Sequence, residues 1–454
     1  MTEPAPRLQQ VLGFAFGVAI IVGNSISVGI LRTPGEVAAQ LPGAGWFLGV
    51  WVAGGLYALC GAMTLAELGA MLPRSGGQYV FARRAFGEYA GFVIGWTDWI
   101  STSGAAAAGA IALGELLRQA SPERAPSSGA VGAVVIVALA LGQWAGIRTS
   151  DRVQQQLSFL KMLALVALAL ACLVAGRAAV AASAPAAASA PAAAATPGAA
   201  PPLLTLAALV LAFQGVLYTY DGWNGIVYFG GEMKDPGREV PRGTAAGVVA
   251  VAIVYILLNA SFVRVLGIGA MRGEPFVASA AAHAAFGAAG EHIIQAATAI
   301  TVLGGVNAIV LIASRIPHAM ADDHLFPAFA ARVNPGGTPA PALLLSAILT
   351  VTLVLTGTFN TVIALSAFFY VLQYAVSFSA LFRLRRTEPD LPRPYRAWGY
   401  PVIPAMVLLG AIAFLAGSFW GDRDNTLRSV VVLAASYPIY RALRWLRPAA
   451  RTAL

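Results

Sequence analysis

The chain has 454 residues, of which 58% are hydrophobic and only 11% are charged, and its formal net charge is +9. Soluble domains carry roughly 25% charged residues, so this composition excludes a water-soluble globule. Apolar runs of about 20 residues recur along the whole length, and each is long enough to cross a bilayer. The sequence therefore predicts an all-α, polytopic membrane protein.

Reading the apolar runs between breakers predicts about twelve membrane-spanning helices. They cover residues 9–32, 45–72, 88–117, 129–147, 154–175, 203–231, 243–268, 291–320, 341–357, 361–384, 402–420 and 427–446. Residues 181–202, rich in Ala and punctuated by Pro, predict a flexible outer loop. Residues 274–287 predict a short outer helix, and the N-terminus lacks the pattern of a cleavable signal peptide.

The basic residues predict an orientation with both termini in the cytoplasm and the chain in the inner (cytoplasmic) membrane. With that orientation the arginine clusters fall on the cytoplasmic side, as the positive-inside rule requires. These clusters are Arg74/Arg83/Arg84, Arg148/Arg152, Lys234/Arg238/Arg242, Arg383/Arg385/Arg386/Arg393/Arg396 and Arg441/Arg444/Arg447. The orientation in the membrane thus accounts for the excess of basic residues, and no nucleic-acid partner is expected.

Two predicted spans are interrupted by residues that disfavour a helix. The first carries IIVGNSISVGILRTPG (residues 20–35), and the sixth carries LAFQGVLYTYDGWNGIVYFGGE (residues 211–232). Irregular backbone persists at membrane depth only where it lines a cavity or is packed in protein. Close packing by small residues explains a single such span. Two breaks at the first and sixth positions favour two five-helix inverted repeats with a ligand between the broken helices.

Such breaks suit a zwitterionic ligand, because free amides attract a carboxylate and free carbonyls attract an ammonium. The repeats also divide the chain. We expect a cytoplasmic tail (1–8), a first repeat (9–175), an outer loop (176–202), a second repeat (203–386) and two peripheral helices with a cytoplasmic tail (387–454).

These segments resemble the amino acid–polyamine–organocation permease superfamily, in particular bacterial relatives of the L-type amino acid transporters. The first break is similar to that family's first-helix signature, and YTYDGWN with GEMKDPGREVPRG is similar to its sixth helix and following loop. AELGAMLPRSGGQYVF, GGVNAIVLIASRIPHAMADDHLFP and PRPYRAWGYPVIP resemble further family segments. The resemblance implies a LeuT-like fold and sodium-independent transport or exchange of L-amino acids by alternating access. Neutral substrates are preferred because the pocket offers no dense acidic cluster.

The resemblance also implies the binding residues. The backbone of Ser27, Val28 and Gly29 would hold the substrate carboxylate, and the carbonyls of Ser25, Tyr218 and Asp221 would hold its amine. Ser27-Val28-Gly29 replaces the family's Gly-Ser-Gly, so the middle hydroxyl is lost. Tyr218 matches the family's gating aromatic, with ordinary aromatic packing as the alternative.

Lys161 is the only lysine within a predicted span, where an amine is costly. Snorkelling to the interface, about two turns away, is one explanation. The resemblance implies another, because in sodium-independent members a lysine on the fifth helix takes the place of a bound sodium and tethers the first helix. We therefore expect no sodium requirement, and protons are a candidate coupling partner because burial perturbs a lysine.

Several further polar residues have two interpretations. Asp221 either contacts the ligand amine or forms a structural hydrogen bond at the turn. Asn224, Asn307, Ser101 and Ser103 either line the pocket or join helices by hydrogen bonds. The other intramembrane acids are Glu67, Asp98 and Glu115; Glu67 is expected to be a packing or gating partner, and none of them is assigned to a proton relay. Arg32 either closes the outer vestibule or reaches the outer interface.

The sequence predicts no cofactor, no metal site and no enzymatic activity. Its four histidines lack metal-ligand spacing, and Cys60 and Cys172 both lie inside spans. The expected partners are an amino acid and the lipid bilayer, with no obligatory protein partner. Two rivals remain: a polyamine or other organic-cation permease, with Asp221 and Asp98 meeting the cation, and a non-transporting sensor or channel.

Overall fold

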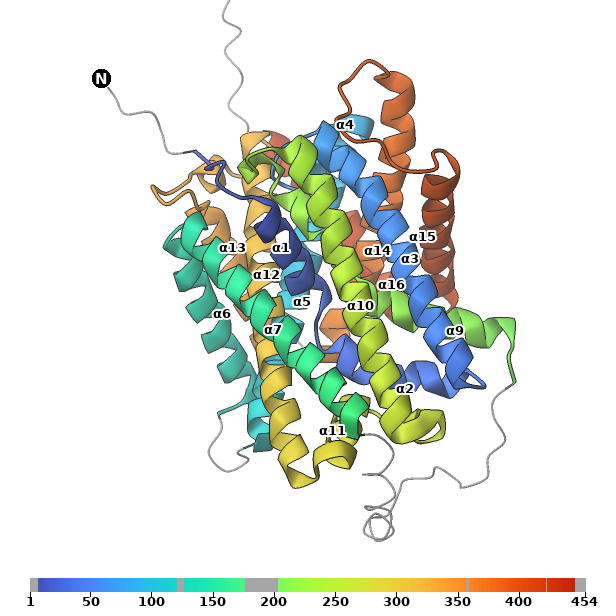
Figure 1. Ribbon diagram of the computed structural model, residues 1–454. Helices are drawn as coiled ribbons and strands as arrows, with labels where there is room; N and C mark the ends of the chain where they lie inside the picture. Colours follow the sequence, from blue (N-terminus) through green and yellow to red (C-terminus); the bar gives the residue numbers. More distant parts are fainter. Residues whose placement is uncertain (1–6, 121–125, 176–202, 357–358, 422, 446–454) are drawn as a thin grey trace, which may run out of the picture.

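The computed structural model describes residues 7–120, 126–175, 203–356, 359–421 and 423–445. These residues form a helical bundle without a β-strand (Figure 1). The first half contains α1 (Phe14–Ser25), α2 (Gly29–Gln40), α3 (Ala44–Met71), α4 (Gln78–Phe86), α5 (Glu88–Ala120), α6 (Ser128–Trp144) and α7 (Ile147–Ala175). The predicted loop at 181–202 lies outside the described residues.

The second half contains α9 (Leu206–Tyr220), the 3₁₀ turns η2 (Gly225–Tyr228) and η3 (Gly230–Glu232), α10 (Pro236–Met271), α11 (Val277–Phe286) and α12 (Ala288–Asp322). After these come η4 (Ala328–Ala331), α13 (Ala340–Thr356), α14 (Phe359–Thr387), α15 (Val402–Gly421) and α16 (Arg423–Trp445). The helix predicted at 274–287 is confirmed as α11, while its place on the outer side stays a prediction.

Five of the described helices are long and apolar enough to cross a membrane, namely α3, α5, α7, α10 and α12. A sixth span arises if α1 and α2 are one interrupted helix, since they bend by 52° at their break. Shorter apolar helices include α6, α9, α13 and α15. Every predicted span contains a helix, so the chain is a multi-pass membrane protein, while the number of twelve spans stays a prediction.

The first break is where the sequence placed it, but it is shorter than the small-residue run suggested. Gly23 and Ser25 still belong to α1, and the helix ends when Ile26 becomes extended, with φ −80° and ψ 104°. The chain resumes as α2 at Gly29. Glycine and serine have low helix propensity, so interrupting the helix here loses little local stability.

The second break differs from the prediction. Gly222, with φ +110°, ends α9 sharply, and the chain continues as η2 and η3 instead of a second α-helical half. The glycines Gly225, Gly230 and Gly231 disfavour a regular α-helix in this stretch. A regular helix returns only at α10, which has Pro236 in its first turn, where proline is well tolerated. The two breaks are therefore not geometrically equivalent.

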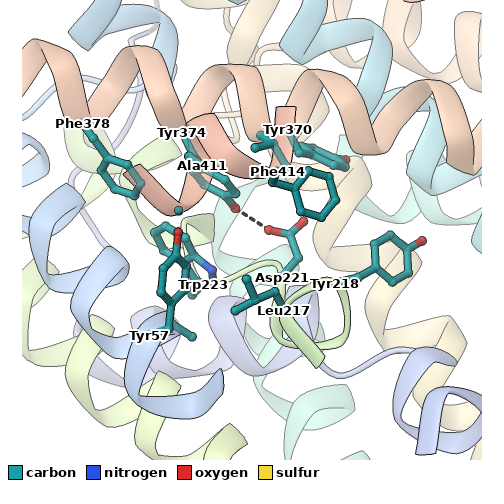
Figure 2. Close-up of a pocket in the computed structure, with 13 residues that line it drawn as sticks. Tyr57, Leu217, Tyr218, Asp221, Trp223, Tyr370, Tyr374, Phe378, Ala411 and Phe414 are labelled. Carbon is teal, nitrogen blue, oxygen red and sulfur yellow. Dashed lines mark hydrogen bonds between the residues drawn. The ribbon is translucent and has the colours of Figure 1, made fainter. Parts of the chain in front are cut away.

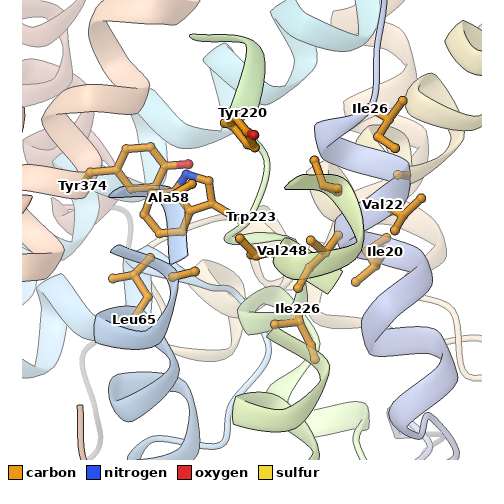
Figure 3. Close-up of a cluster of buried hydrophobic side chains, with 14 of the residues drawn as sticks. Ile20, Val22, Ile26, Ala58, Leu65, Tyr220, Trp223, Ile226, Val248 and Tyr374 are labelled. Atoms are coloured by element: carbon orange, nitrogen blue, oxygen red, sulfur yellow. The ribbon is translucent and has the colours of Figure 1, made fainter. Parts of the chain in front are cut away.

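Small residues let α10 pass close to α1. A Cβ added to Gly247 would lie 2.9 Å from Ile21, and one added to Gly243 would lie 2.8 Å from Ile226. Figure 3 shows side chains of α1, including Ile20 and Val22, facing Ile226 and Val248 across this contact. The burial of these apolar groups fixes α1 against α10 and leaves its broken end inside the bundle.

The end of the bundle that carries α4 is sealed by a buried ion pair. Arg315 of α12 donates to both carboxylate oxygens of Glu232, at 3.1 and 2.9 Å, and both side chains are buried. Ser75 donates to the same carboxylate, and Phe229 lies under the guanidinium at 4.8 Å. The amide of Leu12 binds the carbonyl of Glu232 at 3.0 Å, so the N-terminal segment covers this closure.

Candidate functional site

A cavity of about 520 Å³ lies at the break between α1 and α2. It extends along α2 to Arg32 and Glu36, toward the end of the bundle where α2 and α11 lie (bottom of Figure 1). Seven of the predicted site residues line it: Ser25, Ser27, Val28, Gly29, Tyr218, Asp221 and Asn224. Residues far apart in the sequence thus meet at one hollow.

The start of α2 presents free backbone donors to this cavity. The amides of Ser27, Val28 and Gly29 form no hydrogen bond with any described residue. The first amides of a helix lack intrahelical acceptors, and the helix dipole adds partial positive charge there. This corner of the cavity is suited to a carboxylate.

The ends of α1 and α9 supply carbonyl groups on the other side of the break. The hydroxyl of Tyr255 donates to the carbonyls of Ser25 and Thr219, at 2.8 and 3.0 Å, and so holds the two helix ends together. Asn24 donates to the carbonyl of Gly222 at 3.0 Å. Each carbonyl has two lone pairs, so these bonds leave an acceptor position for a further donor.

Polar side chains of α7 donate hydrogen bonds to backbone carbonyls at and near the end of α1. Ser158 donates to the carbonyl of Ala19 at 2.7 Å, and Gln154 donates to the same oxygen at 3.2 Å. Lys161 Nζ donates to the carbonyls of Gly23 and Ile26, at 3.1 and 2.8 Å. Lys161 is completely buried, and none of the described carboxylates lies within ion-pair distance of it. Among the described residues, the recorded partners of its amino group are therefore these two backbone carbonyls.

The neighbouring helix is shaped to admit this lysine. A Cβ added to Gly304 of α12 would lie 2.9 Å from Lys161 Cε. Lys161 does not extend toward an interface, because its amino group binds a carbonyl of the broken helix and its side chain is completely buried. The snorkelling alternative is therefore wrong for this structure.

Asp221 stands between the large cavity and a small recess of about 70 Å³. Figure 2 shows the recess lined by aromatic side chains, among them Tyr57, Trp223 and Phe378, and the dashed line marks the bond from the Tyr374 hydroxyl to Asp221. This bond spans 2.5 Å. Both interpretations of Asp221 have support, since the side chain is held structurally while the residue lines the cavity.

Tyr218 borders both hollows and is 43% exposed. In Figure 2 its ring points away from the aromatic group around Trp223. A partly exposed aromatic ring at the rim of a cavity has room to change its orientation, unlike a close-packed core side chain. The gating role of Tyr218 stays a prediction, and this placement leaves room for it.

A buried acid lies directly behind the cavity wall. Asp98 of α5 accepts hydrogen bonds from Tyr228 at 2.9 Å and from Thr102 at 3.2 Å, and both donors line the cavity. The amide of Gln373 also donates to Asp98, at 3.3 Å, in the orientation that its surroundings require. Sequence reasoning gave Asp98 a role only in the organic-cation alternative, and it missed Thr102 and Tyr228 because their signal is tertiary contact.

Two predicted lining residues do not reach the cavity. Ser103 is buried with its hydroxyl unpartnered, and its neighbour Thr102 lines the cavity instead. Asn307 donates to Gln154 at 2.7 Å and accepts from Gln143 at 3.0 Å, behind α1. Ser101, the other serine named with them, donates to the side-chain oxygen of Gln373 at 3.2 Å in that same orientation. Their interpretation as links between helices is the one the geometry favours.

The remaining charged candidates have separate places. Glu67 pairs with Arg385 and Arg393, which joins α3 to the end of α14. Arg32 lies over the ring of Phe276 at 5.7 Å, at the border of the large cavity and a neighbouring one of about 340 Å³ that includes Glu115. Its two alternatives, closing the outer vestibule and reaching the outer interface, both stay predictions. No group of three metal-binding side chains occurs within the part of the chain that the structure describes.

These features define a class of protein: a helical membrane protein with a polar cavity at a break in its first span. Comparison with known sequences gives the family. The family model described as amino acid permease matches residues 12–437, and the chain therefore belongs to the amino acid permease family of the amino acid–polyamine–organocation superfamily.

Individual relatives are similar over nearly the whole chain. The serine/threonine exchanger SteT of Bacillus subtilis (strain 168) is 26% identical over 445 residues, which cover 96% of this chain and 97% of the relative. The large neutral amino acids transporter small subunit 2 of Homo sapiens is 28% identical over 443 residues (95% and 80%). The Asc-type amino acid transporter 1 of Mus musculus is 26% identical over 443 residues (95% and 81%). The predicted resemblance is confirmed, and the chain is a membrane transporter of amino acids and not an enzyme.

Proposed function

We propose that this permease carries neutral L-amino acids without sodium, by alternating access around the cavity at the α1–α2 break. The observation that carries the proposal is the pairing of free amides at Ser27–Gly29 with carbonyls at the ends of α1 and α9. This arrangement matches the two charged groups that every α-amino acid shares. The names of the relatives, a serine/threonine exchanger and large neutral amino acid transporters, support the same substrate class.

In this proposal the substrate carboxylate binds the amides of Ser27, Val28 and Gly29. The substrate amine binds the carbonyls of Ser25, Tyr218 and Asp221, and Tyr218 covers the bound molecule. Val28 takes no part through its side chain, so the backbone alone recognises the carboxylate. Rocking of one five-helix repeat against the other would then expose the site to either side.

Lys161 supplies the positive charge that a sodium ion would otherwise supply. Its ammonium binds two carbonyls of the broken α1, which are the kind of oxygen ligands that alkali cations use. A resident cation that is covalently part of α7 makes a second one unnecessary. We therefore expect uptake to be independent of sodium, with exchange or proton coupling as the driving reaction.

Reconstitution in proteoliposomes tests this function. Uptake of a panel of labelled amino acids is measured with sodium or with choline outside, and with or without unlabelled amino acid inside. We expect neutral amino acids to be taken up equally in both salts and faster with internal substrate. Uptake that requires sodium would contradict the role of Lys161, and uptake of no amino acid would contradict the function itself.

A second candidate is an organic-cation permease of the same fold, favoured by the carboxylate of Asp221 at the cavity wall. The part of this candidate that relies on Asp98 has less support, because Asp98 lies behind the cavity wall and does not line the cavity. Competition in the same liposomes separates the two candidates. Putrescine should leave neutral amino acid uptake unchanged if the main proposal holds, and it should be transported itself if the second candidate holds.

We also propose the inner membrane as its location, with both termini cytoplasmic. The support is the gathering of Arg74, Arg83 and Arg84 with the start of α10 at one end of the bundle (top of Figure 1). Labelling of single cysteines introduced at either end, in intact cells, distinguishes the two orientations.

A further inference from the structure

A groove of about 760 Å³ lies outside the transport cavity, on the surface where α10 begins. Its walls come from α3, from the first turns of α10 and from the segment that joins α14 to α15. The charged and aromatic residues that line it include Asp235, Arg238, Arg242, Tyr395 and Trp398. Neither the substrate site nor the closure at Glu232 uses these side chains.

The joining segment forms a firm wall for this groove. The guanidinium of Arg393 donates to four backbone carbonyls of this region, at 2.7 to 3.2 Å. Glu67 of α3 accepts from the amide of Ala397 at 2.6 Å. Pro394 packs closely on Gly237 of α10, where an added Cβ would lie only 2.9 Å from the proline. The groove is therefore preformed.

Two arginines give the groove its charge. Arg238 and Arg242 lie one turn apart on α10, and both are exposed. Within the described residues neither guanidinium takes part in a hydrogen bond or ion pair, and the carboxylate that lines the groove with them is that of Asp235. Arginine presents a planar fork of donors that fits phosphate oxygens.

An apolar stripe continues from the arginines down the same face of α10. Arg238, Arg242, Ala245, Val249 and Ile253 recur every three or four residues, which places them on one face of the helix. Val249 is 43% exposed and Ile253 is 59% exposed, so they face the hydrocarbon when the chain is in a membrane.

Trp398 is 55% exposed and lines the groove at the level of the arginines. Tryptophan is favoured at the boundary between headgroups and hydrocarbon. An occupant of this groove therefore needs an anionic group at one end and an apolar part at the other.

We propose that this groove binds an anionic phospholipid, with its phosphate between Arg238 and Arg242 and its acyl chains along Val249 and Ile253. Basic pockets between membrane helices hold anionic headgroups in this way. The proposal goes beyond the transport function and does not rest on it, because none of the residues involved lines the substrate cavity.

Native mass spectrometry of the full chain in detergent tests the proposal, with phosphatidylglycerol and phosphatidylcholine as probes. The variant is R238Q/R242Q. The matched control is R148Q/R152Q, since these arginines are also exposed, have the same spacing and lie in the first turns of α7. We expect the groove variant to bind phosphatidylglycerol on the order of tenfold more weakly, and the control to bind it as the unchanged protein does.

Three results would overturn the proposal: equal binding of both lipids by the unchanged protein, an equal loss in the control, or displacement of phosphatidylglycerol by inorganic phosphate. The first two indicate general surface attraction, and the third indicates a site for free phosphate. Thermal unfolding checks that the variants fold. If the double variant does not, R242Q and W398A are measured singly, and unchanged lipid binding in both rejects the site.

Discussion

At the scale of single residues, Lys161 is the group on which the sodium-independent proposal depends. Its ammonium holds the carbonyls of Gly23 and Ile26 from inside the protein. A charge at this buried position would rely on these two carbonyl dipoles to compensate for lost water. The same bonds fix the end of α1 beside the cavity.

Replacing Lys161 by alanine should therefore impair transport. Removing the ammonium leaves two buried carbonyls without that donor, and each hydrogen bond to a charged group contributes about 1.5–3 kcal/mol. We expect uptake in proteoliposomes to fall by at least about tenfold, whether or not sodium is added. Lys234→Ala is the control, because Lys234 is exposed and is the only other lysine of the chain. Normal uptake by Lys161→Ala would contradict the tether.

Asp221 permits a test of substrate charge. Asp221→Asn keeps a group that accepts from the Tyr374 hydroxyl but removes the negative charge. If amino acids bind through backbone groups, we expect uptake of neutral substrates to change less than about fivefold, since a neutral hydrogen bond contributes only about 1 kcal/mol.

Tyr374→Phe is the matched variant, because it removes the hydrogen bond and keeps the charge. A loss of all uptake in Asp221→Asn with normal uptake in Tyr374→Phe would show that the carboxylate itself contacts the substrate. That result would favour the organic-cation candidate.

At the scale of elements, the contact between the two breaks depends on Gly222. Its φ of +110° is strained for any residue with a side chain, and an added Cβ would lie 2.6 Å from the carbonyl carbon of Asn24. The backbone at the end of α9 therefore lies directly against the backbone of Asn24 and Ser25 at the end of α1. A side chain at position 222 would therefore push the end of α9 away from the end of α1, and these two ends form the substrate site.

We expect Gly222→Ala to lower the melting temperature and to abolish amino acid binding. Left-handed strain alone costs about 1–2 kcal/mol, and the clash with Asn24 adds to it. Gly273→Ala separates the two effects, because Gly273 has φ +71° but open space around it. Melting curves and binding of a labelled amino acid are measured for both. Equal effects in the two variants would mean that only strain matters.

At the scale of the whole molecule, the ion pair between Glu232 and Arg315 closes one end of the bundle while the cavity extends toward the other. The pair joins η3, just before α10, to α12, and Ser75 adds the segment before α4. Transport by alternating access requires this closure to open, so the buried pair is a cost that each cycle must overcome.

Glu232→Gln should destabilise the protein, because it leaves the Arg315 charge buried and unpaired. Losing one partner of a buried pair costs about 3–5 kcal/mol. Arg74→Gln is the control, since Arg74 forms an exposed pair with Asp323, and such pairs contribute about 0–1 kcal/mol. Thermal unfolding in detergent measures both. A melting temperature in Glu232→Gln no lower than in Arg74→Gln would show that the pair adds no stability.

Several features of the site were predictable because their signals are local. A lysine within an apolar run is visible in the sequence, as are glycines and serines in the middle of a span. The sequence did not reveal the partners of Lys161, nor Tyr255 and Tyr228, because an aromatic residue in an apolar helix has many possible neighbours. Thr102 and not Ser103 lines the cavity, since one residue turns a helix by about 100°.

The sequence by itself determined that the chain is a helical membrane protein, because hydrophobic length and helix-breaking residues act within one segment, while the permease type followed from the resemblance of its motifs to a known family. It also determined where the first helix breaks. Only the tertiary structure decided that the second break continues as 3₁₀ turns, that Asp98 stands behind the cavity wall and that Arg238 and Arg242 border a groove. The reason is physical: each of these depends on how helices far apart in the chain pack, and packing joins residues that sequence spacing does not relate.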